Sequence, residues 1–168
     1  MENQRPTPAS LQRPSKGSHV MQASQAAVSR PQWTETEKQS AFLSCTEFEV
    51  LFGGAKYGAK TDALLMWLIL RAQAYPNSRH LFIRRQLSEI LKQGAGWDRI
   101  QQLLGPRVLY NKTEHTVRLP NASVIEFGHC NEESDKLQYQ GAQYDSIGFD
   151  QIEQFQESQY SFILGACR

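Results

Sequence analysis

An α/β fold, with a mostly parallel sheet flanked by helices, is what the order of segments along this chain predicts. Three short runs rich in β-branched and aromatic residues, at 46–52, 79–84 and 144–149, have the composition of buried strands. Segment 61–74 follows the first run and is apolar on nearly all sides, as in a helix packed against a sheet. Strands that alternate with helices are typical of parallel sheets. The chain supplies only part of such a sheet, so we expect the fold to be incomplete at its C-terminus.

The folded domain is expected to begin after an N-terminal tail. Residues 1–33 carry prolines among Ser, Gln, Ala and Thr, with too little apolar bulk to offset the entropy cost of ordering, which predicts a disordered tail. The basic residues of this tail are either solvated or in contact with DNA. Residues 34–168 then form one domain, which opens with a short helix at 34–45 that Thr34 or Thr36 can cap.

Between the second and third strands, the sequence predicts further helical segments and an inserted β-meander. Glycine and proline divide this region into short pieces with turns between them. Helical segments are expected at 87–92, 97–104 and 134–140, and meander strands at 108–110, 116–119 and 123–127.

Charge and composition constrain the environment of the chain more than its partners. There are 18 basic and 17 acidic residues and a net charge of +1, so no overall field points to nucleic acid or membrane. Cys45, Cys130 and Cys167 contain no close pair, which indicates reduced thiols rather than disulfides. The longest apolar run, 63–70, is far shorter than the roughly 20 residues that a membrane helix needs. We therefore expect a soluble protein without a membrane partner.

The strand at 46–52 leads into a glycine-rich stretch that opens the apolar helix. From Gly54 onward the sequence follows the phosphate-loop pattern G-x-x-x-x-G-K-[ST], with Ala59 at the second glycine. The backbone N–H groups of such a loop can bind a polyphosphate, with Lys60 on the terminal phosphates and the Thr61 hydroxyl on magnesium. The predicted nucleotide-binding residues are Gly53, Gly54, Ala55, Lys56, Tyr57, Gly58, Ala59, Lys60 and Thr61.

Two alternatives remain open at this loop. It can be a plain glycine-rich turn between a strand and a helix, with two incidental lysines. Ala59 is acceptable if its position has helical dihedral angles, whereas a positive φ would make alanine costly. The mismatch at Ala59 means that the case for nucleotide binding depends on a second feature of the chain.

That second feature is Asp150, which ends the strand at 144–149. An acid in this place lies at the carboxyl edge of a parallel sheet, so Asp150 and Thr61 are predicted to bind Mg²⁺ together. The alternative for Asp150 is a helix cap or turn residue. The next residue, Gln151, stands where many ATPases of this type have a catalytic glutamate. An amide cannot accept a proton, so we expect slow hydrolysis unless Gln151 acts by orienting the water.

Four segments together resemble the large subunit of tailed-phage terminases, the ATP-driven motors that package DNA into procapsids. The phosphate loop is similar to that of the family, although the family is richer in glycine where Tyr57 and Ala59 stand. The approach to Asp150 resembles the second nucleotide motif of the family, with Gln151 in place of the glutamate. The four segments are 51–65, 82–85, 139–151 and Phe155 with 160–168.

The resemblance implies a P-loop NTPase-like fold that binds ATP and Mg²⁺. It implies that Gln39 contacts adenine and that Lys56 senses the γ-phosphate, which places Lys56 with Gln151 among the catalytic residues. A polar helix face is the alternative for Gln39, and a solvated loop lysine is the alternative for Lys56. The partners that the resemblance implies are double-stranded viral DNA, the small terminase subunit and the portal of the procapsid, in the cytoplasm of a bacterial host.

Two interpretations of function follow from these residues. In the first, the chain is the ATPase portion of a terminase large subunit. In the second, it is a truncated prophage remnant that binds nucleotide but hydrolyses little or none, which Gln151 and the early stop at Arg168 favour. The resemblance ends before the nuclease domain of the family, so no nuclease residue is transferred. A P-loop kinase of small molecules is disfavoured because the sequence contains no arginine-rich lid.

Overall fold

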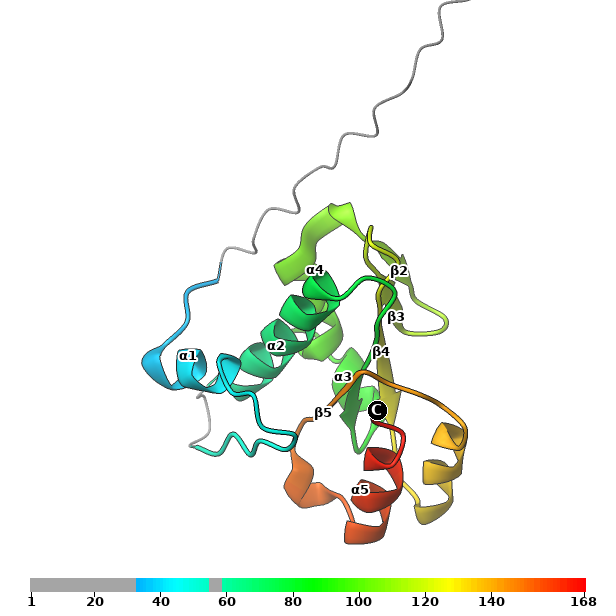
Figure 1. Cartoon of the computed structure of the whole chain (residues 1–168). Coiled ribbons are helices and arrows are strands. Elements are labelled where there is room, and N and C mark those ends of the chain that lie inside the picture. The colour runs from blue at the N-terminus through cyan, green and yellow to red at the C-terminus, as the bar shows by residue number, and fades with distance from the viewer. Residues whose placement is uncertain (1–32, 55–58) are drawn as a thin grey trace, which may run out of the picture.

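Helices cover both faces of a mixed sheet in the computed structural model of the chain, which describes residues 33–54 and 59–168 (Figure 1). The helices are α1 (Glu37–Leu43), α2 (Lys60–Ala74), α3 (Leu87–Leu91), α4 (Gly96–Leu104) and α5 (Glu157–Leu164). The strands are β1 (Arg79–Arg84), β2 (Leu109–Asn111), β3 (Thr116–Arg118), β4 (Val124–His129) and β5 (Ser146–Phe149). Short 3₁₀ turns lie at Gly105–Arg107, Glu133–Tyr139 and Ile152–Gln154. Of the predicted tail at 1–33, residues 1–32 lie outside the described residues.

The strands of the sheet lie in the order β2-β3-β4-β1-β5. β1 pairs in parallel with β4 on one side and with β5 on the other, whereas β3 pairs antiparallel with both β2 and β4. The parallel centre and the inserted meander that the sequence predicts are therefore both present, and β4 belongs to both. Because β1 and β5 run in the same direction, their carboxyl ends meet at one edge of the sheet, and Arg84 and Asp150 lie there.

Helix α2 fills the interior because it is apolar on nearly every side. Leu65, Leu68 and Ile69 are fully buried and belong to the same cluster as the apolar residues of α4. Glycine at position 148 of β5 allows α2 to approach closely, since a Cβ on Gly148 would lie 2.9 Å from Leu64 Cδ1. Burying each leucine or isoleucine of this set contributes roughly 1.5–3 kcal/mol. The position of α2, and with it the first turn that carries Thr61, is thus fixed by packing on the sheet.

The other face of the sheet is covered by α5 and by the 3₁₀ turn Glu133–Tyr139. Leu81 and Ile83 of β1 point to this side and pack with Ile163 of α5. Phe82, between them, belongs instead to the cluster around α2. Since side chains alternate along a strand, Arg84 points to the same side as Phe82, toward α2.

The strand predicted at 46–52 does not form. The segment has no strand assignment, and the side chains of Phe48 and Leu51 are 75% and 80% exposed. Phe52 stacks on Phe42 of α1, with 4.9 Å between the ring centroids, so its ring packs on a helix. Within the described residues, no backbone hydrogen bond joins this segment to β5. The prediction was wrong because β-branched and aromatic composition favours an extended backbone, while a strand also needs an edge with which to pair.

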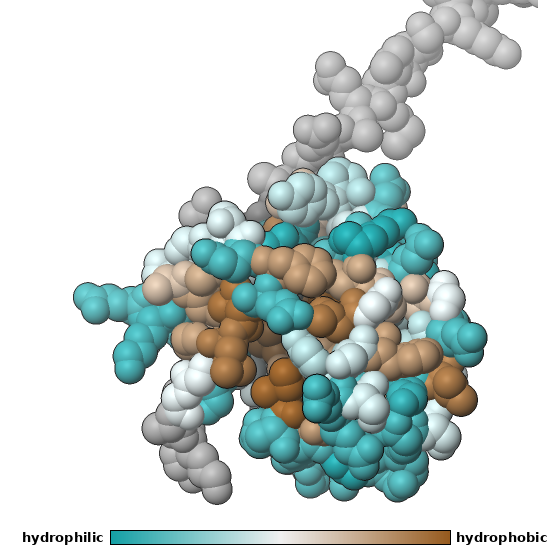
Figure 2. Space-filling view, turned by 60° about the horizontal axis from the view of Figure 1, so that its bottom comes forward, coloured by the Kyte–Doolittle hydropathy of each residue, from teal (hydrophilic) through white to brown (hydrophobic). Residues whose placement is uncertain are grey.

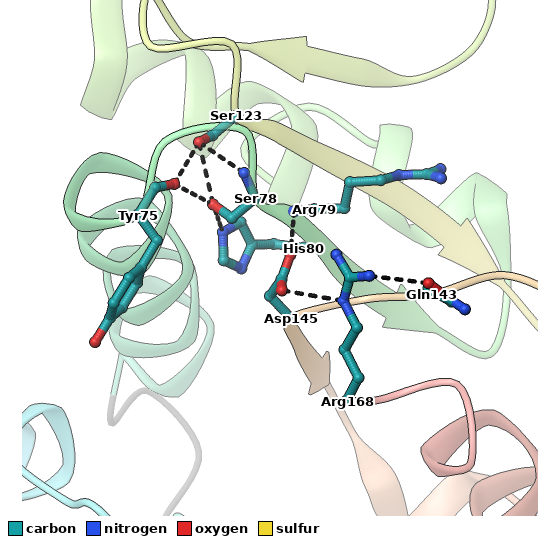
Figure 3. Close-up of polar contacts among 8 residues, drawn as sticks. All are labelled: Tyr75, Ser78, Arg79, His80, Ser123, Gln143, Asp145 and Arg168. Atoms are coloured by element: carbon teal, nitrogen blue, oxygen red, sulfur yellow. Dashed lines mark hydrogen bonds and ion pairs between the residues drawn. The ribbon is translucent and has the colours of Figure 1, made fainter.

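A polar cluster lies at the opposite edge of the sheet, where β1 and β5 begin (Figure 3). His80 is 1% exposed, and its Nε2 lies 2.7 Å from the hydroxyl oxygen of Ser78. The Ser78 hydroxyl oxygen also lies 2.5 Å from the carbonyl oxygen of Tyr75 and 3.1 Å from the hydroxyl oxygen of Ser123. Nδ1 of His80 is buried and has no hydrogen-bond partner in the described part of the chain. Burial lowers the pKa of His80 from 6.5 to about 4; the nearby Asp145 carboxylate opposes this shift and Arg71 adds to it.

The buried His80 predicts a loss of stability in mild acid. Its pKa is lower in the folded state than in the unfolded chain, so the unfolded chain binds more protons as the pH falls from 6.5 toward 4. The contribution of neutral His80 to the free energy of unfolding is complete above the pKa that His80 has in the unfolded chain. It falls by about 3 kcal/mol as the pH drops through the pKa that His80 has in the folded chain. His80→Gln does not titrate, so its stability should fall less over the same interval. Denaturant unfolding of both proteins at each pH measures the difference, and parallel pH profiles would contradict the prediction.

Candidate functional site

The glycine-rich stretch meets α2 at the carboxyl edge of β1 and β5. Gly53 and Gly54 precede the gap in the described residues, and α2 begins at Lys60 directly after Ala59. Lys60 Nζ donates a hydrogen bond to the carbonyl oxygen of Gly54, at 2.9 Å. The predicted binding residues 55–58, which include Lys56, lie outside the described residues. The N-terminus of this 15-residue helix, with the positive end of the helix dipole, faces the described ends of the loop.

Ala59 adopts a left-handed conformation, with φ 47° and ψ 37°. Of the two alternatives that the sequence leaves open at this position, the structure has the costly one, because a left-handed backbone disfavours any residue with a Cβ by roughly 1–2 kcal/mol. Gln151, on the other side of the site, is also left-handed, with φ 60° and ψ 52°. Non-glycine residues in this conformation are uncommon and concentrate at functional sites.

Replacing Ala59 by glycine is expected to stabilise the protein. The substitution relieves the left-handed strain, but glycine gains freedom in the unfolded chain, so the net gain in the free energy of unfolding should be about 0.5–1 kcal/mol. Denaturant unfolding measures it. Ala63→Gly, in the right-handed and buried interior of α2, is the matched control and should destabilise instead. A loss of stability in Ala59→Gly would contradict the account of the loop.

Thr61 and Asp150 are in contact, although 89 positions separate them in the sequence. The Thr61 hydroxyl oxygen lies 3.2 Å and 3.0 Å from the two carboxylate oxygens of Asp150. Asp150 is 6% exposed, and its backbone N–H donates to the carbonyl oxygen of Ile83 at 2.9 Å, which fixes it beside β1. Arg84 NH2 lies 3.1 Å from Asp150 Oδ2. Burial raises the pKa of Asp150 above its ordinary value, while Arg84 and Thr61 act in the opposite direction.

The side chains of Thr61 and Asp150 offer the kind of donor that Mg²⁺ takes. This ion prefers oxygen ligands and typically combines one or two protein carboxylates with phosphate oxygens and water. Across residues 33–54 and 59–168, no group of three His, Cys, Asp or Glu side chains is placed to hold a metal. A magnesium ion at this site would therefore take a hydroxyl and a carboxylate from the protein and the rest of its ligands from phosphate and water.

A cavity of about 560 Å³ opens beside these residues. Segment 48–54 lines one side of it and 147–153 the other, and Lys60, Asp150 and Gln151 all reach it. Figure 2 shows apolar surface gathered in the middle of this face of the molecule, with hydrophilic residues around it. Cavities of this size, mostly apolar with a few convergent polar groups, are typical of small-molecule sites. The cavity is large enough for a nucleotide whose phosphates lie toward Lys60.

Gln151 faces the cavity next to Asp150. Its side-chain oxygen accepts a hydrogen bond from Gln154 Nε2 at 3.0 Å, which fixes the orientation of the amide. The other acidic residues along the described lining are Glu49 and Glu153. The side chain beside Asp150 is an amide, which cannot accept a proton, so the chemistry that this arrangement supports directly is binding, with a water molecule at most oriented by Gln151.

Gln39 is buried against the N-terminus of α2. Its side-chain nitrogen donates to the carbonyl oxygen of Ala59 at 3.2 Å, and its side-chain oxygen accepts from the backbone N–H of Thr36 at 2.9 Å. With 3% exposure, it does not lie on a solvated polar face of α1. Adenine contact by Gln39 remains a prediction, and its amide is committed to holding α1 against the end of the loop.

Two ion pairs at the site were not predicted from the sequence. Besides Arg84 with Asp150, Arg99 of α4 pairs with Asp62, at 2.9 Å from Nε to Oδ1 and 2.6 Å from NH2 to Oδ2. This two-point pair ties the first turn of α2 to α4. It raises the pKa of Arg99, chiefly through the hydrogen bonds that Arg99 donates to the Asp62 carboxylate. The sequence does carry a signal for Arg84, because the strand at 79–84 ends in basic residues, but only the strand register shows what Arg84 faces.

Comparisons with known proteins agree with the fold. No protein-family model and no curated protein sequence matches the chain. A solved structure, that of the large terminase from a thermophilic bacteriophage, matches with a TM-score of 0.62 and 13% sequence identity. The match covers 80% of this chain and 36% of the phage protein. At this level of identity the likeness establishes a shared fold, in line with the terminase resemblance of the sequence.

None of the helices in the described part of the chain is both long enough and apolar enough to cross a membrane.

Proposed function

We propose that this chain binds Mg-ATP at the loop that precedes α2, as the nucleotide-binding part of a terminase-like DNA-packaging motor. One observation carries the proposal: Thr61 and Asp150 come from the two segments that resemble nucleotide motifs, and their side chains are in direct contact at the carboxyl edge of the parallel strands. A plain glycine-rich turn gives no reason for a buried carboxylate to meet the second residue of the helix. The fold shared with a phage large terminase supports the same conclusion.

The residues of the chain divide the work of binding between them. The N–H groups at the start of α2 and the Lys60 ammonium would hold the phosphates, since both present positive charge to one point. Thr61 and Asp150 would hold a magnesium ion, whose charge offsets that of the phosphates. The apolar wall of the cavity, with Phe52 and Trp67, would exclude water from the rest of the nucleotide. DNA, a small terminase subunit and a portal are the partners that belong to this proposal.

A second candidate is a nucleotide-binding module that does not turn over, and Gln151 favours it. The side chain beside Asp150 is an amide whose oxygen is already bonded to Gln154. Loss of a general base typically slows catalysis by roughly 10²–10⁴-fold while binding persists. The two candidates share the same site and differ only in the fate of the γ-phosphate.

The dependence of thermal stability on phosphate number tests the proposal. A ligand that binds only the folded state raises the unfolding midpoint, and at one concentration the rise is larger for a ligand that binds more tightly. If the phosphates are bound at α2, the midpoint in the presence of Mg²⁺ should rise in the order adenosine, AMP, ADP, ATP, and EDTA should reduce the effect of ATP most. An equal effect of adenosine and ATP, or none from either, would refute a phosphate site.

A further inference from the structure

The carboxylate of Asp150 already has a cationic partner within the chain. Arg84 NH2 lies 3.1 Å from Asp150 Oδ2, and the two side chains are 15% and 8% exposed. Ile83 pairs with Phe149 in parallel register, so the next residues of the two strands, Arg84 and Asp150, lie side by side at the same edge. The pair therefore follows from the strand register and does not depend on a chance rotamer at the surface.

Arg84 is held in this position from a second direction. Its NH1 donates to the carbonyl oxygen of Glu89 in α3 at 3.2 Å, while its Nε is buried and has no hydrogen-bond partner among the described residues. The guanidinium thus bridges the middle of α3 and the carboxylate of Asp150. A buried carboxylate that lost this partner would keep only neutral donors, the Thr61 hydroxyl and the Gln151 backbone N–H, and an uncompensated buried charge is strongly destabilising.

A divalent cation at Asp150 would compete with Arg84 for the same oxygen. The guanidinium occupies Oδ2, and two cations around one buried carboxylate repel each other. A triphosphate changes this balance, because its negative charge can compensate the guanidinium while the carboxylate turns to the metal. The geometry thus makes metal binding unfavourable without a nucleotide and favourable with one.

We propose that Arg84 is the internal counter-ion of Asp150, a positioning residue that holds the carboxylate until a metal–nucleotide complex replaces it. This inference rests on the proposed function and deepens it by making the metal arrive with the triphosphate. Arg84 lowers the affinity of the protein for a divalent cation alone and so couples metal binding to nucleotide binding. Coupling of this kind is reciprocal, so the metal must strengthen nucleotide binding by the same factor.

Binding of Mn²⁺ alone, followed by the electron paramagnetic resonance signal of the free ion, tests the proposal. Arg84→Met should bind Mn²⁺ roughly tenfold more tightly than the wild-type chain, because the cation no longer competes with the guanidinium. Arg85→Met is the matched control, since it removes the same charge from the next residue, whose guanidinium donates to the Gln154 carbonyl and not to Asp150. If Arg85→Met tightens Mn²⁺ binding as much as Arg84→Met, or if neither changes it, the proposal is overturned.

A second readout covers the risk that Arg84→Met folds poorly. Its unfolding midpoint should fall without Mn²⁺ and recover when Mn²⁺ is added, whereas the midpoint of Arg85→Met should respond to Mn²⁺ as the wild type does. If Arg84→Met folds neither with nor without Mn²⁺, Arg84→Lys replaces it, since lysine keeps the positive charge but changes its position relative to Asp150. A gain in Mn²⁺ affinity smaller than tenfold in Arg84→Lys supports the proposal, and no gain contradicts it. An ATP analogue titrated against the wild-type chain separates the two claims. If the analogue does not bind but Arg84→Met binds Mn²⁺ more tightly than the wild type, only the nucleotide site is refuted. If the analogue binds but Arg84→Met binds Mn²⁺ no more tightly than the wild type, only the role of Arg84 is refuted.

Discussion

Replacing Lys60 by alanine is expected to weaken the binding of a nonhydrolysable ATP analogue by roughly 10- to 100-fold, the worth of a hydrogen bond between charged groups. Lys60 is the first residue of α2, and its ammonium lies 2.9 Å from the carbonyl oxygen of Gly54, at the described end of the loop. From this place it can turn to phosphates held by the helix N-terminus. Isothermal calorimetry in the presence of Mg²⁺ measures the change in affinity.

Lys112→Ala is the control for this experiment. Lys112 is an exposed residue of the turn between β2 and β3, at the sheet edge opposite to β5, and carries the same charge. Its removal should leave the affinity unchanged. The unfolding midpoint of Lys60→Ala must be followed in parallel, because this variant also loses the hydrogen bond to Gly54. Equal affinities in the wild type and in a folded Lys60→Ala variant would exclude a phosphate site at α2.

Gln151→Glu is expected to raise the rate of ATP hydrolysis by roughly 10²–10⁴-fold, or to make it measurable where the wild type has none. Glutamate has the same length as glutamine, so the carboxylate would take the place of the amide beside Asp150, at the cavity. It supplies a proton acceptor for an attacking water, which the amide lacks. Release of inorganic phosphate under saturating Mg-ATP measures the rate.

The gain must depend on the site and not on added negative charge. Gln154→Glu places a carboxylate on the next turn of the same segment, where the amide now bonds Gln151, and it should not raise the rate. Gln151→Glu combined with Lys60→Ala should lose most of the gained turnover at subsaturating ATP. If Gln151→Glu binds the analogue like the wild type and still releases no phosphate, the missing base is not what limits this chain.

The sequence predicts the parts of this fold that composition and periodicity specify locally. Helix α2, the strands of the meander, β1 and β5 all appear close to their predicted bounds, because apolar helices and short alternating strands leave a local pattern. The contact of Thr61 with Asp150 was predicted by a topological argument, since the carboxyl ends of parallel strands meet at one edge. The strand expected at 46–52 does not form, because the composition of a segment does not determine whether a neighbouring strand is available for pairing.

What could not be predicted at the site depends on backbone geometry and register. The left-handed conformation of Ala59 could not be predicted, because a missing glycine in the motif does not determine the dihedral angles at that position. The sequence shows Arg84 only as a basic residue at the end of a strand. Its pairing with Asp150 follows from the register of β1 and β5, which the sequence does not specify. Burial of Gln39 depends on how α1 docks against α2, which a polar residue on a short helix does not reveal.

A calorimetric titration of the unmodified chain with a nonhydrolysable ATP analogue, with Mg²⁺ and again with EDTA, tests the central claim most directly. If Lys60, Thr61 and Asp150 form one Mg-nucleotide site, the chain binds one analogue per molecule, and binding weakens when the metal is removed. A titration that shows no binding at millimolar analogue, or the same affinity with Mg²⁺ and with EDTA, would contradict the claim.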